Sequence, residues 1–549
     1  MPPTRTATGL RRLPFDRFRS FSSLFTTYCT DYDRLAAFYA GDWRSPEARR
    51  AAAERTAAHP RDHAALADVL LDQNARWGLD HATREHIEAL RGGESVAVVT
   101  GQQVGLFGGP LYTPYKTITA LQLAERLADE AGRPVVPIFW LEGGDHDLAE
   151  VASLRLLRHN DPVAMHYTGH TLPEDGNLGP VGRLRLTGQI EHLVERLGET
   201  LPPSDFHDRM MALVRESYRP GTTLLDAFAR LLRGLFPDAG LVFLDPDDTR
   251  LKRLAAPLFR REIEDYEAAH AHLGEATDRL AEAFHAQVRT RPTNLFLLDE
   301  DGRHPLDAEG DGFRLRDRDQ RFTRDDLLDL LDDDPGRFSP NVVLRPLMQD
   351  SLLPTAAYVG GPGEVAYFGQ YKGVYEWAGV PMPIIYPRAS VSLVESKIQK
   401  VLDRHALDVA DLDADAQRLF QRIVVGAMEI DVEAVFKEAG RHLHEAVNTL
   451  KPQVEKVDRT LVRSAEATRA ALLKEFEKLK ARVVRAEKHQ HEEIGAQIEK
   501  AQANLFPAGT LQERALSLLY FINKYGLDLP VRLRHTLDVD TSAHQVVEL

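Results

Sequence analysis

The sequence predicts an α/β fold built on a doubly wound parallel sheet, and two observations carry this prediction. Short β-branched or aromatic runs recur along the chain and end in glycine-rich segments. Amphipathic helical segments separate these runs, and strands that alternate with helices form parallel sheets because each connection crosses a face of the sheet. With 549 residues, the chain is long enough for several domains.

The bulk composition is that of a globular protein and excludes several functional classes. Hydrophobic residues make up 43% and charged residues 28% of the chain, and the formal net charge is −15. This negative charge argues against nucleic-acid or membrane-surface binding, because both partners need a basic face. No apolar stretch is long enough for a signal peptide or a membrane span, and the single cysteine, Cys29, excludes a disulfide framework. We therefore expect a cytoplasmic protein that binds neither nucleic acid nor membrane.

The first strand–helix–strand unit begins at residues 95–100, where SVAVVT leads into glycine-rich sequence. The helix predicted next, at 115–132, places its apolar residues on one face and ends at Gly132. A second buried strand, PVVPIFW, follows at 134–140. Further strands of the same character are predicted at 240–246, 341–350, 355–364 and 381–390.

The remaining segments divide the chain around this core. Residues 1–92 are predicted to form a helical N-terminal segment, and residues 93–395 form the core. Two polar stretches, at about 150–200 and 290–340, interrupt the core pattern, and we interpret them as insertions that lie outside the sheet. Residues 506–549 are predicted to pack back on the core.

Residues 396–505 are typical of a continuous helical arm. Apolar side chains recur there every three or four residues, which is the spacing of a coiled-coil seam. We predict a long antiparallel helix pair with its hinge near NTLKPQ, residues 448–453. The predicted seam consists of Val454, Val457, Leu461, Ala465, Thr468, Leu472, Phe476, Leu479, Val483 and Ala486.

The segment VVTGQQVGLFGGPLYTPYK, residues 98–116, is the first candidate for a binding site. It contains neither the P-loop spacing nor GxGxxG, so the two common phosphate motifs are absent. Ligands nevertheless bind at the carboxyl ends of parallel strands, where this segment is predicted to lie. A tight strand-to-helix connection is the alternative explanation of its glycines. The residues predicted to bind substrate here are Thr100, Gly101, Gln102, Gln103, Tyr112 and Lys116.

The DHD sequence after the second strand places His146 between Asp145 and Asp147. A carboxylate beside an imidazole fixes its tautomer and raises its basicity, which suits a general base. Because this loop follows a neighbouring parallel strand, we expect it to lie beside the first loop. The alternative is that one aspartate caps a helix and the histidine is merely exposed. We predict these three residues as the catalytic ones.

Two later segments supply further candidates. A second glycine-rich turn and the strand after it offer an acid, an arginine and a tyrosine to a polar substrate, namely Gly361, Glu364, Tyr367 and Arg388. Turn chemistry alone explains the glycines there equally well. At the base of the arm, the polar group of Asn504, Gln512, Glu513 and Arg514 either binds a ligand or, as is commoner, caps and packs a helix.

Several long and unusual segments together resemble the family of bacillithiol biosynthesis cysteine-adding enzymes. These segments are VVTGQQVGLFGGPLYTPYK, PVVPIFWLEGGDHD, GGPGEVAYFGQY, VPMPIIYPRAS and NLFPAGTLQERALSLLYFINKYG, and the resemblance begins at LPFDRF, which starts at Leu13. The resemblance implies a Rossmann-like core related to class I nucleotidyltransferases, two insertions, and a coiled-coil arm that helps to form a homodimer. It also implies a ligase that joins L-cysteine to the amine of glucosaminyl-malate in the last step of bacillithiol synthesis.

The resemblance further implies ATP or ADP as a ligand in a site away from the core pocket, at Asn504, Gln512, Glu513 and Arg514. The chain lacks the HIGH and KMSKS motifs of class I synthetases, and Gly144 stands where the family has an acid before the DHD. No metal site is predicted. Two rival functions stay open. One is a nucleotidyltransferase or a hydrolase with a metal at residues 145–147, and the other is a non-catalytic, dimeric nucleotide-binding scaffold.

Overall fold

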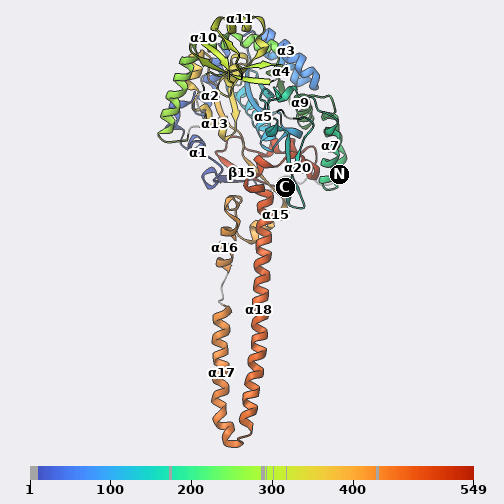
Figure 1. Cartoon of the computed structure of the whole chain (residues 1–549), viewed down its shortest axis with the longest axis vertical. Helices are drawn as coiled ribbons and strands as arrows, with labels where there is room; N and C mark the ends of the chain where they lie inside the picture. The colour runs from blue at the N-terminus through green and yellow to red at the C-terminus, as the bar shows by residue number, and fades with distance from the viewer. Residues whose placement is uncertain are drawn as a thin grey trace. The chain divides into compact units, whose positions relative to one another are not determined.

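The computed structural model describes residues 10–171, 173, 176–285, 288, 291, 293–300, 302–316, 318–427 and 432–549. The chain divides into two compact units (Figure 1). The first comprises Met1–Val394 and Thr510–Leu549, and the second comprises Glu395–Gly509. No helix in the described part of the chain is both long and apolar enough to cross a membrane.

The first unit is built on a parallel sheet of five strands. In sheet order these are β13 (Ile384–Pro387), β12 (Thr355–Gly360), β2 (Val96–Gln103), β3 (Val135–Glu142) and β6 (Val242–Leu244). All four strand pairs are parallel. If the five strands are numbered along the chain and read from the β6 edge, their order is 3-2-1-4-5. This is the Rossmann order 3-2-1-4-5-6 without its sixth strand. The prediction of a doubly wound parallel sheet is confirmed.

Helices shield this sheet because its strands are apolar on both sides. Val96 to Val99 have no exposed surface, as expected for strands in the middle of a parallel sheet. Two neighbouring helices, α2 and α5, pack on β12, β2 and β3, while a second pair, α3 and α4, packs on β6 and β3. Their bounds are Pro46–Ala57 for α2, His63–Trp77 for α3, His81–Arg91 for α4 and Tyr112–Ala131 for α5. Helix α5 closes at Gly132 as predicted, and Gly132 takes a left-handed conformation at the C-cap.

The prediction of a strand at 341–350 is wrong. The chain forms a short strand, β11 (Phe338–Pro340), and then a helix, α12 (Leu344–Leu352). Leu344 and Leu347 are fully buried, so the apolar run reflects burial in a helix. A short apolar run does not distinguish the two structures. The helix is started by the Asn341 side chain, whose Oδ1 accepts hydrogen bonds from the N–H groups of Val343 at 2.8 Å and Leu344 at 3.1 Å.

The two interrupting stretches contribute no strand to the parallel sheet in the described residues. The first contains a hairpin of β4 (Ser153–Arg158) and β5 (Asp161–His166). The second contains all five strands of an antiparallel sheet ordered β10-β9-β8-β7-β11. The new bounds in that sheet are Leu295–Asp299 for β7, Gly302–Glu309 for β8, Gly312–Leu315 for β9 and Arg321–Phe322 for β10.

The two ends of the chain meet in a third sheet. Strand β15 (Ala543–Glu548) lies between β1 (Leu10–Pro14) and β14 (Val391–Val394). It runs antiparallel to β1 and parallel to β14. The further helices of the first unit are α1 (Ser23–Thr30), α6 (Leu148–Val151), α7 (Gln189–Thr200), α8 (His207–Ser217), α9 (Leu224–Leu235), α10 (Thr249–Ala281), α11 (Arg324–Asp333), α13 (Pro362–Phe368), α14 (Lys372–Ala378), α19 (Gln512–Ala515), α20 (Leu518–Tyr525) and α21 (Leu529–Thr536).

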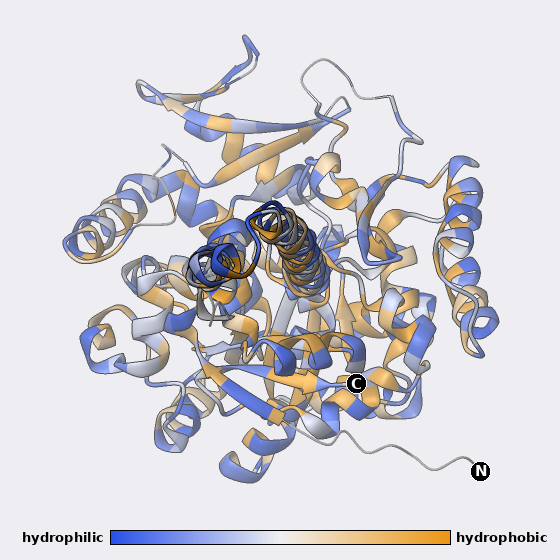
Figure 2. Cartoon of the chain, turned by 90° about the horizontal axis from the view of Figure 1, so that it is seen from below, coloured by the Kyte–Doolittle hydropathy of each residue, from blue (hydrophilic) through white to orange (hydrophobic). Residues whose placement is uncertain are grey.

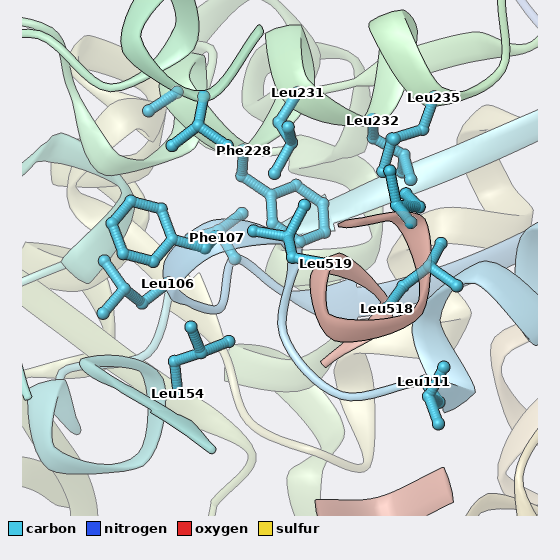
Figure 3. Close-up of a cluster of buried hydrophobic side chains, with 14 of the residues drawn as sticks. Leu106, Phe107, Leu111, Leu154, Phe228, Leu231, Leu232, Leu235, Leu518 and Leu519 are labelled. Atoms are coloured by element: carbon cyan, nitrogen blue, oxygen red, sulfur yellow. The ribbon is translucent and has the colours of Figure 1, made fainter. Parts of the chain in front are cut away.

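The glycine-rich loop after β2 is partly a core element. Its single turn η4 (Leu106–Gly108) buries two large side chains, Leu106 and Phe107. Figure 3 shows them together with leucines of α9 and α20 and with Leu154 of β4. The ribbon of Figure 2 shows hydrophobic and hydrophilic residues side by side on many helices, as expected where one face of a helix packs and the other meets solvent.

The second unit is a helical arm. Its helices are α15 (Ser396–Arg404), α16 (Ala416–Ala427), α17 (Val432–Val457) and α18 (Leu461–Leu505). The prediction of continuous helix from residue 396 is wrong, because a single-turn segment, η7 (Val409–Asp413), separates α15 from α16. The expected antiparallel pair is α17 and α18, which pack together with Phe436 and Phe476 in ring contact at 5.2 Å.

The hinge of this pair lies beyond the predicted position. Helix α17 runs through Pro452 and ends at Val457. The turn follows at Asp458, whose carboxylate accepts hydrogen bonds from the N–H of Thr460 at 2.8 Å and from its hydroxyl at 2.7 Å. An aspartate that bonds the backbone two residues later favours a turn, so local chemistry at residues 458–460 decides where the chain reverses.

The predicted seam is only partly covered on α18. Ala465, Phe476 and Val483 are half-buried. Leu461, Leu472 and Leu479 keep 44%, 44% and 50% of their surface exposed, although they belong to the same predicted seam. The side chain of Ala486 lies outside the described residues. The arm therefore carries an apolar row that α17 does not cover.

Candidate functional site

A large cavity lies at the carboxyl edge of the parallel sheet. Its volume is about 1040 Å³, and strands β2, β3 and β12 all end in its wall. Strands β2 and β12 are neighbours in the sheet, but β2 connects onward to β3 and β12 connects onward to β13 on the opposite side. The order of the strands reverses at this point, and such switch points are where ligands bind in open α/β sheets.

Lys116 and Glu364 form an ion pair on the floor of this cavity. The Lys116 ammonium also donates to the Gly101 carbonyl at 2.7 Å and to Gln102 Oε1 at 3.0 Å. Glu364 accepts further hydrogen bonds from the Tyr358 hydroxyl at 2.6 Å and from the N–H of Gly361 at 2.7 Å. Burial alone would raise the pKa of Glu364, but Lys116 and these hydrogen bonds hold that pKa below its usual value.

Arg388 is already neutralised within the protein. Its guanidinium donates to both carboxylate oxygens of Glu513, at 3.0 Å and 2.6 Å, and to the Ala389 carbonyl at 2.8 Å. Both side chains are almost fully buried, at 2% and 0% exposure. Glu513 also accepts from the Ser390 hydroxyl at 3.0 Å and the Val391 N–H at 2.8 Å, so its carboxylate is fully used. Arg388 lines the cavity and Glu513 does not, so the pair holds the Arg388 side chain in place in the wall.

The DHD loop joins β3 to α6 and lies at the rim of the same cavity. The Nδ1 atom of His146 is 3.2 Å from Asp145 Oδ1, and the imidazole is 37% exposed. Arg303 of β8 lies 3.5 Å from the same Asp145 oxygen. Asp147 instead caps α6, because its carboxylate accepts from the Glu150 N–H at 3.1 Å. The imidazole thus faces the cavity with one carboxylate beside it, and the second aspartate takes the capping role that was the alternative.

The backbone of this loop is held in place by the first insertion. The Asp145 carbonyl accepts from the Val181 N–H at 2.7 Å, and the Gly143 carbonyl accepts from the Gly182 N–H at 2.9 Å. Glu142, the last residue of β3, accepts from the Trp140 indole at 3.0 Å and from the Gly144 N–H at 3.1 Å. The backbone N–H of Gly144 therefore helps to hold the Glu142 carboxylate in place.

Most of the predicted site residues lie together in the wall of this one cavity. They are Gly101, Gln102, Gln103, Tyr112, Lys116, Asp145, His146, Asp147, Gly361, Glu364, Tyr367, Arg388 and Arg514. They lie in or after the ends of four strands, β2, β3, β12 and β13, and in α19, so sequence positions more than 400 residues apart converge here.

Four predicted residues lie elsewhere. The Thr100 hydroxyl donates to the Val359 carbonyl at 2.9 Å, so it joins β2 to β12. Gln512 bonds the backbone of Leu393 through both ends of its amide, and Glu513 holds Arg388 from behind the wall. Asn504 belongs to the second unit, where its amide donates to the Lys500 carbonyl at 2.8 Å.

The lining side chains that sequence reasoning missed include Trp140, Glu142, Arg303 and Arg345. Trp140 and Glu142 belong to the strand before the DHD sequence, which became β3. The prediction considered only the more polar loop that follows this strand. Arg303 comes from the second insertion, which the sequence describes only as polar. Arg345 lies on α12, and the wrong prediction of a strand there hid its place at the start of a helix.

A smaller cavity of about 230 Å³ adjoins the main one. The two share Gln102, Gln103, Tyr112, Glu150 and Arg514 in their walls. The glycine-rich loop contributes Gly105 and Gly109 here, while the β4–β5 hairpin contributes Arg155 and His166. The glycine-rich segment 98–116 thus has two roles. It buries Leu106 and Phe107 in the core, and it borders both cavities.

The arrangement suits acid–base and group-transfer chemistry on a polar substrate. The tyrosine hydroxyls are neutral donors and acceptors, because burial raises the pKa values of Tyr112, Tyr358 and Tyr367. His146 offers a half-exposed imidazole, and several arginines offer fixed positive charge. Within the described ranges, no three His, Cys, Asp or Glu side chains are grouped to hold a metal ion.

Comparisons with known proteins cover the whole length of the chain. A sequence profile of the bacillithiol biosynthesis BshC N-terminal Rossmann-like domain matches residues 12–389. A second profile, of the bacillithiol biosynthesis BshC C-terminal coiled-coil domain, matches residues 391–549.

Several curated relatives, including the following three, carry the name "Putative cysteine ligase BshC". The protein from Salinibacter ruber is 58% identical over 547 residues, which cover 99% of this chain and 100% of that protein. The protein from Chloroherpeton thalassium is 35% identical over 94% of this chain and 95% of its own length. The protein from Chlorobaculum tepidum is 35% identical over 88% of both chains.

Proposed function

The chain belongs to the bacillithiol biosynthesis BshC family, and from this premise we propose that it is a cysteine ligase of bacillithiol biosynthesis. The proposed substrates are L-cysteine and glucosaminyl-malate. The product is an amide between the cysteine carboxyl and the amine of the sugar. The observation that carries the proposal within this chain is the cavity at the switch point, which gathers an imidazole, carboxylates and arginines.

We assign His146 as the general base. An amine that attacks an acyl group must lose a proton, and a neutral imidazole at the cavity rim can accept it. Asp145 Oδ1 lies 3.2 Å from Nδ1, close enough for its charge to stabilise the imidazolium that forms. The C–N bond forms as the bond from the acyl carbon to its leaving group breaks, and the amine proton passes to His146.

ATP is the proposed source of the activated cysteine carboxyl. A free carboxylate has no adequate leaving group, so one of its oxygens must leave attached to a phosphate or to AMP. Three of the four residues predicted for a nucleotide, namely Asn504, Gln512 and Glu513, make hydrogen bonds within the protein. Of the four, only Arg514 presents a charge to the cavities. We derive no step from nucleotide contacts.

We also propose that the protein is a cytoplasmic homodimer. The exposed leucine row on α18 supports a second copy as the partner of the arm, because such rows pack against another helix in coiled coils. The reduced state of a thiol product suits the cytoplasm.

The test is complementation of a bacterial strain that lacks its own copy of this gene. We expect the intact chain to restore bacillithiol, measured by thiol derivatisation and mass spectrometry, and His146→Ala to restore less than about a hundredth of that level. A deletion strain that keeps its bacillithiol would overturn the proposal. Purified protein supplied with cysteine, glucosaminyl-malate and ATP tests the chemistry directly, and the assay without ATP tests the activation.

The same variant separates ligase from scaffold. A non-catalytic scaffold would tolerate His146→Ala, because the half-exposed imidazole carries no packing role. Normal thiol levels with this variant would therefore favour the scaffold. A metal-dependent activity without any thiol substrate would favour the hydrolase alternative.

A further inference from the structure

The arginine and lysine side chains that line the main cavity differ in whether a carboxylate pairs with them. Three of its buried arginine and lysine side chains have a carboxylate partner within 4.0 Å: Lys116 with Glu364, Arg303 with Asp145, and Arg388 with Glu513. Arg345 is half-buried in the same wall, and no carboxylate in the described part of the chain pairs with it. A guanidinium that is partly removed from water and unpaired is the group most ready to receive an anion.

The partners that Arg345 does have are neutral. Its Nη1 donates to Gln349 Oε1 at 3.1 Å, and it shares a hydrogen bond with the Tyr367 hydroxyl. Its guanidinium carbon lies 5.7 Å from the Tyr358 ring centre and 5.9 Å from that of Trp140. Aromatic faces hold a guanidinium in place without neutralising it. Because a guanidinium has five N–H donors, this environment leaves donors for a ligand.

The nearest carboxylates are occupied. Glu364 is held by Lys116, Tyr358 and the Gly361 backbone. Glu142 is held by the Trp140 indole and the Gly144 backbone. Neither is within ion-pair distance of Arg345, although both contribute negative potential around it. Their fixed positions explain how a charged arginine is tolerated here before an anion arrives.

Arg345 lies at the start of α12. It is the second residue of this nine-residue helix, and Asn341, Val342 and Arg345 all line the cavity. The N–H groups of Val343 and Leu344 already donate to Asn341 Oδ1, so they are not available to an anion. The guanidinium of Arg345 is therefore the group that this end of the helix offers to an anion in the cavity.

Other unpaired arginines differ from Arg345 in their exposure. Arg291 and Arg514 also line the cavity without a carboxylate partner among the described residues, but both side chains lie in solvent. Water hydrates their charges, so neither provides a desolvated anion site. Arg388, which the sequence predicted to bind a polar substrate, already donates to both oxygens of Glu513.

We propose that Arg345 is the carboxylate-binding residue of the cavity and that it holds a carboxylate of the malate moiety in a two-hydrogen-bond contact. The identity of the carboxylate rests on the proposed function, whereas the anion site rests on the geometry of α12 and the aromatic wall. Malate bound here lies beside the Lys116–Glu364 pair, and the sugar amine extends toward the DHD rim.

The test measures binding of malate to the full-length protein by isothermal titration calorimetry. We expect Arg345→Gln to weaken binding by about tenfold to a hundredfold, the usual effect of losing hydrogen bonds to a charged group. Arg345→Lys should fall between, because it keeps the charge and loses the planar fork. The diamide of malate should not bind to the unsubstituted protein. Unchanged affinity in Arg345→Gln, or the absence of malate binding to the unsubstituted protein, would overturn the inference.

Arg316→Gln is the matched control. Arg316 lies in the same cavity wall, but its guanidinium is paired with both oxygens of Asp307, at 2.9 Å and 2.7 Å. We expect its loss to change malate affinity by no more than about twofold, since a paired exposed arginine contributes little. An equal effect of the two substitutions would point to the general charge of the cavity and would contradict a specific role for Arg345.

Kinetics separate this inference from the ligase proposal. If the enzyme makes bacillithiol, Arg345→Gln should raise KM for glucosaminyl-malate with little change in KM for cysteine. If the unsubstituted enzyme makes no product yet binds malate through Arg345, the anion site stands and the ligase proposal fails. If product forms and KM is unchanged in the variant, the inference fails and the ligase proposal stands.

Discussion

His544 is a fully buried histidine held between two serines behind the cavity wall. Its Nδ1 is 2.8 Å from the Ser390 hydroxyl and its Nε2 is 2.9 Å from the Ser392 hydroxyl. Glu513 favours its protonation, but burial dominates and lowers the pKa of His544 to about 4. The imidazole is therefore neutral in the folded protein at neutral pH and links β15 to β14.

This residue makes stability depend on pH in a defined direction. In the unfolded chain the pKa of histidine is about 6.5, so the unfolded state gains a proton as pH falls through that value while the folded state does not. The stabilisation is therefore complete above about pH 6.5 and is lost progressively down to pH 4, by about 3 kcal/mol in all.

We expect the melting temperature of the unsubstituted protein to exceed that of His544→Gln most clearly above pH 7, and the difference to shrink toward pH 4. Other buried groups, including Asp245, Glu262 and Asp350, titrate in both proteins and cancel in the difference. Thermal unfolding measured by circular dichroism at a series of pH values checks this. A difference that stays constant across the series would show that the imidazole does not titrate with folding.

Single residues of the site were predictable where they follow the end of a recognisable buried strand. Lys116, His146 and Glu364 follow runs that only a buried strand explains, so the switch-point rule places them together. Arg388 illustrates the limit, because nothing in the sequence reveals that Glu513, 125 residues away, consumes its charge. Pairing of charges is a tertiary property, and it decides which cations are free to bind a ligand.

At the scale of elements, the apolar run at 341–350 shows why strand and helix were confused. Both faces of this segment are buried, so the alternation that identifies a half-buried strand and the spacing that identifies a surface helix are both lost. The deciding signal is Asn341, whose side chain starts the helix and which was counted as part of a strand.

The DHD loop depends on the contact of two glycines, and this contact supports a second prediction. A Cβ atom on Gly182 would lie 2.9 Å from the Gly143 Cα and 3.2 Å from the Gly143 carbonyl oxygen. We expect Gly182→Ala to push the loop that carries His146 outward and to lower activity by about tenfold to a hundredfold, because small displacements of a catalytic group are costly. Thiol levels in the complemented strain measure the effect.

Gly188→Ala is the control for this change. Gly188 lies in the same insertion, its φ is −57°, and no atom lies within 4 Å of the position of an added Cβ. We expect normal thiol levels and an unchanged melting temperature in this variant. Full activity of Gly182→Ala would show that the first insertion does not position the loop.

At the scale of the whole molecule, the sequence predicted the kinds of element and their layers better than the order and pairing of the strands. Strand runs separated by helices predict a parallel sheet, and the polar stretches predict segments outside it. The order of the strands and the small antiparallel sheet of the second insertion were not predictable, because register and pairing depend on contacts far apart in the chain. The helical arm was predicted correctly, but its apolar seam was expected to be covered, whereas Leu461, Leu472 and Leu479 stay exposed on α18.

The exposed leucine row of the arm supports the last prediction. Leu461, Leu472 and Leu479 repeat at coiled-coil spacing on α18 and stay exposed after α17 has packed. We expect the protein to be a homodimer by light scattering, and the double substitution Leu472→Glu with Leu479→Glu to yield monomers, because each glutamate would bury a charge in an apolar contact. Ala470→Glu with Ala481→Glu adds the same charge to two other exposed positions of α18 and should leave the dimer intact. A dimer that survives the leucine substitutions would place the interface elsewhere, and a monomeric unsubstituted chain would rule out the dimer itself.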